Sequence, residues 1–246
     1  MLGRTHMAVG AGAACLLLPV VLQSSGIPAW HDITSGNWSA LIHSAEFIVA
    51  SVVGSIAPDL DESHSLLAQK VEVLGRLLLL IAIIGLTLWA HIALTPLEWA
   101  AWGFLTFSML TRANWARKIA LLALAAGALY AAGLGVMSTA GGIGLALWCV
   151  GAAFTSHRTW THSLAGLACL VPAGLWMMNH GLARWVTGFV IGYVLHLIAD
   201  FVSGGVPLFY PLGKKRLGFR LVRTGGWTDH AIGAGATFVA LATLFL

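Results

Sequence analysis

Charged side chains are scarce in this sequence of 246 residues. Asp, Glu, Lys and Arg together make up 9% of the chain, whereas soluble globular domains carry about 25%. Because 59% of the residues are hydrophobic and the mean hydropathy is +0.87, the composition excludes a water-soluble globule and also intrinsic disorder. Thirteen basic residues are too few for a nucleic-acid-binding surface, so no nucleic-acid partner is expected. The composition instead predicts an integral membrane protein.

Cysteine is rarer still, with three residues that all lie inside apolar runs and form no Cys-x-x-Cys pair. This excludes a zinc-thiolate site and a disulfide framework, and we interpret Cys15, Cys149 and Cys169 as packing residues. Acidic residues number nine, but histidines number ten. Because polar groups are costly inside a bilayer, the histidines are where chemistry is expected.

The apolar runs predict an all-α fold. A membrane-spanning helix needs about 20 apolar residues, and about eight or nine runs approach that length, so a polytopic transmembrane bundle in a single domain (1–246) is expected. The runs cover residues 7–23, 38–57, 73–94, 97–111, 117–136, 141–156, 162–179, 183–200 and 230–246. The fourth and sixth are short, so one of them could be re-entrant. The first is interpreted as an uncleaved anchor rather than a signal peptide, because no small-x-small cleavage site precedes Gln23.

The basic residues predict the orientation of this bundle. With nine spans, Arg184 alone falls on one side and the other basic residues all fall on the opposite side, which is then cytoplasmic. They are Arg4, Lys70, Arg76, Arg112, Arg117, Lys118, Arg158, Lys214, Lys215, Arg216, Arg220 and Arg223. The N-terminus is expected to face the cytoplasm of a bacterial cell.

Two carboxylates follow a proline at the cytoplasmic end of the second predicted span. Asp59 and Asp61 come directly after Pro58, which ends a helix or opens a turn. Two carboxylates one residue apart on irregular backbone can converge on one cation. The alternative is a helix-stop motif with solvated acids.

A polar segment lies between the sixth and seventh predicted spans. His157 and His162 flank a short turn, Thr161 is a candidate N-cap for the next helix, and Arg158 has a planar guanidinium suited to phosphate. The alternative is an interfacial loop whose histidines lie at the level of the lipid headgroups.

A histidine and a carboxylate close the eighth predicted span. His196 and Asp200 are four residues apart, so they share one helix face as a ligand pair, or as a ligand and its orienting group. A buried hydrogen bond that serves only packing is the alternative. His6, just before the first span, adds an imidazole on the same side.

All of these groups reach the same end of the bundle under the topology that the basic residues predict. They are His6, Asp59, Asp61, His157, His162, His196 and Asp200. Seven imidazole and carboxylate groups exceed the needs of one metal ion, so a site for two or more divalent metals at the cytoplasmic end is predicted.

These segments together resemble the LexA-regulated, YdjM-like family of inner-membrane metal-dependent hydrolases. The resemblance rests on PDLD with a following serine (58–65), HRTWTHSL (157–164), and GYVLHLIAD running into GVPLFYP (192–211). It implies a metal site, to which an early histidine matching His6 and a C-terminal acid matching Asp229 would contribute. Glu62 occupies a position where relatives often have histidine, and His64 follows two residues later, so either could assist the site. A fainter likeness is to zinc-dependent phospholipases C and nucleases.

The predicted function is a membrane-bound hydrolase that uses zinc or manganese on a phosphoester at the cytoplasmic interface, with membrane lipids as partners and a lipid phosphate as the favoured substrate. Asp59 is expected to bridge metals, His157 to act as ligand or orienter, and Arg158 to neutralise developing charge. A metal-ion or proton transporter is the competing class, which predicts ligands near the bilayer midplane and an internal repeat. A membrane scaffold with a structural metal is the third. The oligomeric state is left open.

Overall fold

The computed structural model describes residues 1–21, 38–62, 65–89 and 115–243, together with residues 95, 99 and 103. Among these residues the regular elements are helices, and the only strand-like feature is an isolated bridge between Val206 and Leu217. The all-α fold class is therefore confirmed. Almost all of the predicted span 97–111, and His64, lie outside the described residues.

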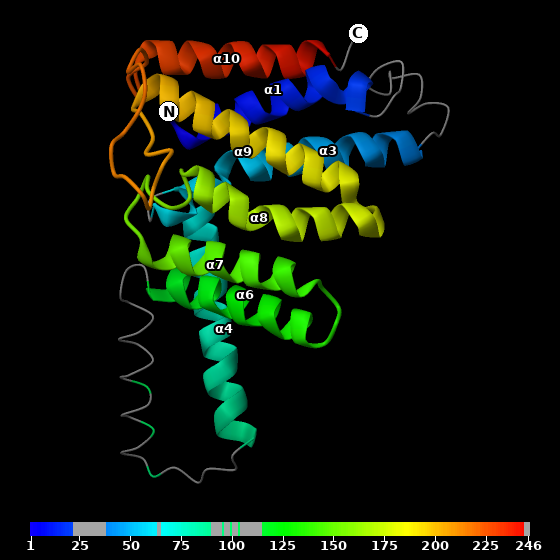
Figure 1. The fold of residues 1–246 in the computed structure, drawn as a ribbon, viewed down its shortest axis with the longest axis vertical. Helices are drawn as coiled ribbons and strands as arrows, with labels where there is room; N and C mark the ends of the chain where they lie inside the picture. Colours follow the sequence, from blue (N-terminus) through cyan, green and yellow to red (C-terminus); the bar gives the residue numbers. More distant parts are fainter. Residues whose placement is uncertain are drawn as a thin grey trace.

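The helices fall into two groups (Figure 1). In chain order they are α1 (Gly3–Val21), α3 (Trp38–Ile56), the short 3-10 helix η1 (Ala57–Asp61), α4 (Leu66–Trp89), α6 (Trp115–Gly133), α7 (Thr139–Phe154), α8 (Leu164–Met177), the π-helical turn η2 (Met178–Leu182), α9 (Ala183–Ser203) and α10 (Trp227–Ala242). Helices α1, α3, α9 and α10 pack together, and α4, α6, α7 and α8 pack in series beside them. The chain passes from one group to the other at η1 and again at η2.

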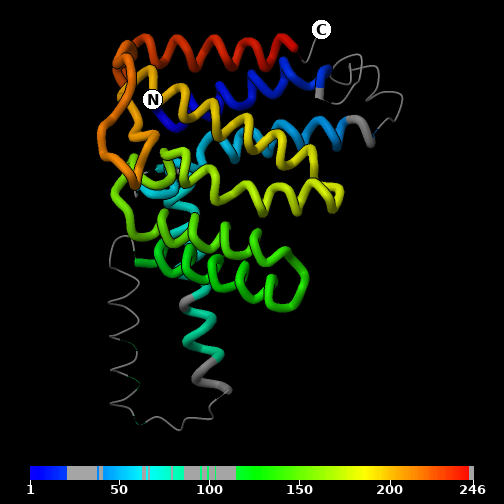
Figure 2. Tube along the Cα trace, viewed as in Figure 1, coloured from blue at the N-terminus to red at the C-terminus, as the bar shows by residue number. Residues whose placement is uncertain are grey.

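Three stretches of the described residues are long and apolar enough to cross a membrane. They are Leu41–Asp61, Trp115–Gly133 and Leu164–Ser203. The last contains a reversal, because His180 and Gly181 leave the helical conformation and Gly181 has a φ of 84°. Helices α8 and α9 consequently run in opposite directions, as the trace in Figure 2 shows. Membrane character is confirmed, and the total of eight or nine spans stays a prediction.

A buried core ties the two groups together around α7 and α9. Trp148 of α7 and Tyr193 of α9 belong to one buried cluster, which also contains Leu60 of η1. The Trp148 indole N–H donates to the Tyr193 hydroxyl at 3.2 Å, and that hydroxyl donates to the backbone carbonyl of Thr161. Cys149, fully buried and unpaired in this cluster, is a packing residue as predicted. The core therefore holds the 157–162 segment directly.

Glycines bring α3 and α9 into close contact. A Cβ atom added to Gly192 would lie 1.9 Å from the Ser51 carbonyl oxygen, and one added to Gly54 would lie 2.0 Å from the Phe189 carbonyl oxygen. Small residues allow membrane helices to approach at the level of the backbone. Because α3 leads into Asp59 and α9 carries His196, this crossing sets the separation of two predicted metal ligands.

Replacing Gly192 by leucine is expected to force α3 and α9 apart. The added side chain overlaps backbone, so the change should lower the free energy of unfolding by about 3 kcal/mol or more, and metal content should fall with it. Thermal unfolding in detergent and elemental analysis would measure both. The matched control is Gly127→Leu on α6, where an added Cβ meets no atom within 4 Å. Equal stability of the two variants would contradict the tight crossing.

Candidate metal centre

Helix ends from both groups meet at one end of the bundle, where Figure 1 places the N-terminus and the loop before α10. Pro58 lies in the first turn of η1, so α3 ends at Ile56 and the chain turns inward, which leaves Asp59 and Asp61 beside α9. Helix α9 brings His196 and Asp200 in its last two turns. The predicted convergence of early, middle and late segments therefore occurs.

The first group of candidate ligands contains His6, His196 and Asp200, all of them buried. The imidazole of His6 stacks on that of His196, with ring centroids 3.9 Å apart. The Nε2 atom of His6 lies 3.4 Å from Oδ1 of Asp200, and Nε2 of His196 lies 3.8 Å from Oδ2 of the same carboxylate. Residues from the two ends of the chain thus share one carboxylate.

The second group contains Asp59, His162 and, again, His196. The Nε2 atoms of His162 and His196 are 3.1 Å apart. Both face Oδ1 of Asp59, at 3.7 Å and 3.6 Å respectively. In each group the three ligand atoms lie within 4.8 Å of one another, so the two groups overlap at His196.

The backbone fixes the orientation of His196. Its Nδ1 lies 2.7 Å from the carbonyl oxygen of Ser55, which can only accept a hydrogen bond, so Nδ1 carries the proton. The lone pair of Nε2 is then free to bind one metal ion where the two ligand groups meet. A ring oriented in this way by its other nitrogen is typical of metal-ligating histidines.

The donor set fits a divalent metal ion. Imidazole nitrogen and carboxylate oxygen are ligands of zinc and manganese, and buried polar atoms normally have hydrogen-bond partners. Here both ring nitrogens of His6 and Oδ2 of Asp200 are buried without one. The Asp200 carboxylate also lies beside two cations. The Met1 ammonium is 2.9 Å from Oδ1, and Nη2 of Arg158 is 3.0 Å from Oδ2. The Arg158 contact is an ion pair without hydrogen-bond geometry.

The carboxylates around His162 favour the cationic form of its imidazole. Burial alone would lower the pKa of His162, but the carboxylates of Asp200 and Asp59, with the charge of Asp61, outweigh it and raise this pKa to about 9. The imidazole is therefore held in its cationic form when no other cation competes for these carboxylates.

Asp61 and His157 lie outside both ligand groups. Oδ1 of Asp61 lies 2.9 Å from Nδ1 of His157, while Oδ2 accepts from the Arg158 backbone N–H at 3.1 Å and from the Thr161 hydroxyl at 2.7 Å. Asp61 therefore clamps the 157–161 segment onto η1. The prediction of Thr161 as N-cap of the following helix is wrong, because its hydroxyl is used by Asp61 and Ser163 caps α8 instead, accepting from Gly166 N–H.

Asp229 also lies outside the two groups. Its Oδ2 accepts from the backbone N–H groups of Leu2 at 3.0 Å and Gly225 at 2.8 Å, whereas its buried Oδ1 has no partner. Burial raises the pKa of Asp229, but these backbone donors outweigh it, so the pKa falls below its ordinary value. The carboxylate joins the start of α10 to the segment that leads into His6.

A polar cavity of about 570 Å³ adjoins the ligand groups. Asp59 lies on its wall, and the cationic side chains of Arg4 and Arg158 face it. Glu62 is on the same wall, with Oε2 3.8 Å from Nε2 of His157. His64, the alternative to Glu62, lies outside the described residues. Sequence reasoning missed the Ser55 carbonyl and Arg4, because a backbone acceptor and a charged residue near a terminus give no motif.

The fold and the centre define an all-helical membrane protein with buried histidine and aspartate side chains gathered at one end of its bundle. The chain belongs to the YdjM inner membrane protein family, whose model matches residues 1–246. This confirms the resemblance to the YdjM family and the inner-membrane location, while metal binding and hydrolase activity stay predictions. No curated protein and no solved structure matches the chain.

Proposed function

We propose that this protein is a metal-dependent hydrolase of the inner membrane that cleaves a phosphoester of a lipid at the cytoplasmic interface. The observation that carries the proposal is the pair of ligand groups that overlap at His196 and border the polar cavity. His6, His196 and Asp200 would hold one metal ion, and Asp59 and His162 would hold a second beside it.

Divalent metal ions bound there would supply Lewis acidity and an activated water at neutral pH. The chain's own residues provide the remaining functions. Arg158 lines the cavity, and its planar guanidinium suits phosphoryl oxygens and the charge that develops on them. His157, held by Asp61 at 2.9 Å, orients the wall of the cavity. Asp59 lies both in a ligand group and on the cavity wall, so it would hold a metal ion at the edge of the cavity.

A lipid phosphate is favoured as substrate because polar and apolar groups meet in the cavity. Ile56 and Leu67 line it together with Arg4 and Arg158. The ligands lie at helix ends, where the charge distribution of the sequence predicts the cytoplasmic headgroup region. A transporter would instead need ligands near the bilayer midplane, so the hydrolase is preferred to it. The adjoining cavity favours a reactive centre over a purely structural metal.

Metal counting and phosphate release test this proposal together. We expect the purified protein to contain zinc or manganese and to hydrolyse a phosphomonoester or phosphodiester lipid in preference to a nucleotide. Asp59→Ala should lower turnover more than about 100-fold, because it removes a ligand, whereas Glu72→Ala, which removes a carboxylate paired with Arg76 on α4, should not. Metal-free protein from a metal-replete preparation, or bound metal without turnover of any phosphoester, would contradict the hydrolase.

A further inference from the structure

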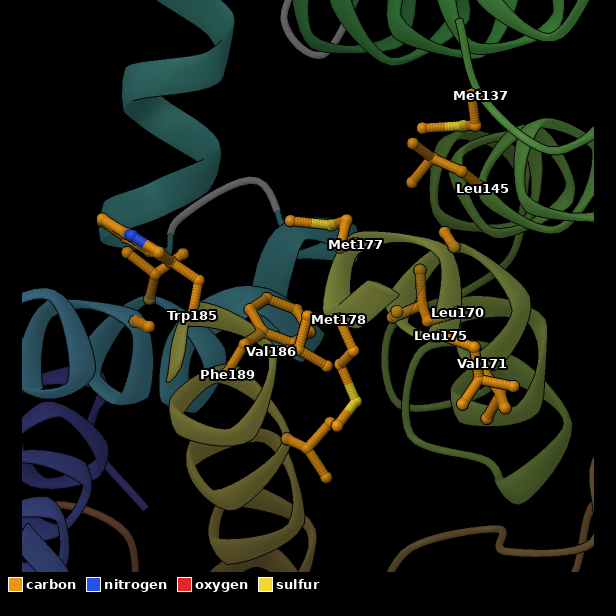
Figure 3. A pocket seen from close by; sticks show the side chains of 15 residues that line it. Met137, Leu145, Leu170, Val171, Leu175, Met177, Met178, Trp185, Val186 and Phe189 are labelled. Atoms are coloured by element: carbon orange, nitrogen blue, oxygen red, sulfur yellow. The ribbon is translucent and has the colours of Figure 1, made fainter. Parts of the chain in front are cut away.

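An apolar crevice opens between the two helix groups (Figure 3). Its volume is about 430 Å³, and its walls come from α8, η2, the first half of α9, the last two turns of α3, and Met137 and Leu145 before and in α7. Figure 3 shows Val171 and Leu175 of α8, and Val186 and Phe189 of α9, among the side chains that line it. These α9 residues precede His196 by two to three turns, so the crevice lies deeper in the bundle than the metal centre.

Position and volume identify the kind of ligand that this crevice fits. Its α3, α8 and α9 walls belong to the candidate spans Leu41–Asp61 and Leu164–Ser203, so the crevice lies at the depth of lipid tails. An apolar cavity of about 150 Å³ holds one benzene molecule, so 430 Å³ accommodates about three, or roughly eighteen carbon atoms. That is the size of one fatty acyl chain. An isoprenoid of many units exceeds it.

The last turns of α3, together with η1, lead from the crevice to the polar cavity. Ala50 and Val53 line the crevice, and Ile56 and Asp59 line the cavity. Each is three residues from the next and so neighbours it, but three residues fall about 60° short of a full turn, so the row winds around the helix from the crevice to the cavity. From Val53 to Asp59 the rise is about 9 Å at 1.5 Å per residue, a distance that a glycerol backbone and the first carbons of an acyl chain span.

We propose that the crevice binds one acyl chain of the glycerophospholipid whose phosphoester enters the metal centre. This inference rests on the proposed function, which supplies the phosphoester headgroup. It adds the acyl chain, the part of the substrate by which the protein would recognise a lipid. Met137, Met177 and Met178 contribute flexible thioether side chains to the walls, which suits chains of different conformation. The second acyl chain stays in the bilayer.

Photocrosslinking of the full-length protein in lipid nanodiscs tests the acyl site. The probe is phosphatidic acid with a diazirine in the middle of one acyl chain, and the crosslinked peptides are mapped by mass spectrometry. We expect crosslinks to concentrate in peptides of α8 and α9 that line the crevice. Val53→Trp fills part of the crevice and should therefore lower the yield of these crosslinks about tenfold. A tenfold loss of affinity is expected when roughly two methylene groups of the acyl chain are no longer buried.

The matched control is Val150→Trp on α7, because its valine is 41% exposed, close to the 40% of Val53, and lies outside the crevice. Leu175→Trp repeats the test from the α8 wall in case Val53→Trp fails to fold. Unchanged crosslinking in both filled variants, or labelling spread over lipid-facing helices, would overturn the proposal.

Measurements of lipid hydrolysis test the acyl site and the proposed hydrolase activity separately. If both hold, Val53→Trp should raise the KM for long-chain phosphatidic acid about tenfold and leave turnover of a dibutyryl analogue unchanged. Crevice crosslinks without hydrolysis of any phosphoester would support the acyl site and overturn the hydrolase. Hydrolysis of long-chain lipid without crevice crosslinks would overturn the acyl site and leave the hydrolase standing.

Discussion

Replacing His196 by alanine is expected to weaken metal binding whichever of the two ligand groups holds the ion. Its Nε2 faces Asp59 and His162 on one side and Asp200 on the other, so no other single residue of the described chain belongs to both groups. Loss of a shared ligand should lower metal affinity more than about 100-fold, since even the groups that orient a ligand are worth 10–100-fold. Turnover should fall at least as far. Elemental analysis and isothermal titration with zinc would measure the loss.

The control for this substitution is His180→Ala. His180 is an exposed histidine in η2, at the opposite end of α9, and its Nδ1 lies 2.8 Å from the Trp176 carbonyl oxygen. It should bind metal as the wild type does. A His196→Ala protein that folds normally and keeps its full metal content would show that the two ligand groups are not the metal site.

Replacing Arg158 by alanine is expected to abolish most turnover while metal stays bound. Nη2 of Arg158 lies 3.0 Å from Oδ2 of Asp200, yet arginine cannot serve as a metal ligand, so its removal frees a carboxylate and should preserve or strengthen metal binding. Loss of one preorganised donor to developing charge costs about 10²–10³ in turnover. Steady-state kinetics with metal content measured on the same preparation would separate the two effects.

Arg220→Ala is a closely matched control for that experiment. Arg158 and Arg220 have φ values of 57° and 56°, so both changes place alanine in the same left-handed backbone conformation, but Arg220 is exposed in the loop before α10. Any loss of turnover caused by alanine in this backbone conformation should therefore appear in both variants, and a loss seen only in Arg158→Ala is due to the missing guanidinium in the cavity. Equal losses in the two variants would rule out a specific role for Arg158 in the reaction.

The residues of the candidate site could be predicted because they have ionisable side chains, which are rare in membrane helices. His6, His162 and His196 stand out in an apolar chain, and the placement of basic residues puts them at one end. The role of Asp61 could not be predicted, because its hydrogen-bond partners lie 96 to 100 positions later in the chain. Spacing alone does not tell which of two neighbouring carboxylates turns toward a metal and which turns toward a loop.

The fold was predictable at the level of class and less so in its packing. Long apolar runs indicate helices, but they do not indicate which helices touch. The approach of α3 to α9 depends on Gly54 and Gly192 facing each other's helices, and the sequence has 29 glycines with no local mark on these two. The crevice depends on α8 and α9 diverging after a tight reversal at Gly181, which neither hydropathy nor charge records.

The contact between the two ends of the chain has a consequence for biosynthesis. Helix α1 can pair with α3 soon after both enter the membrane, but His6 meets Asp200, and the Leu2 backbone meets Asp229, only after α9 and the start of α10 exist. At about 5–20 residues per second, ribosomes need roughly 10–40 s to make the intervening chain. The centre therefore matures last, and a chain that ends before α9 contains His6, Asp59 and His162 but neither His196 nor Asp200.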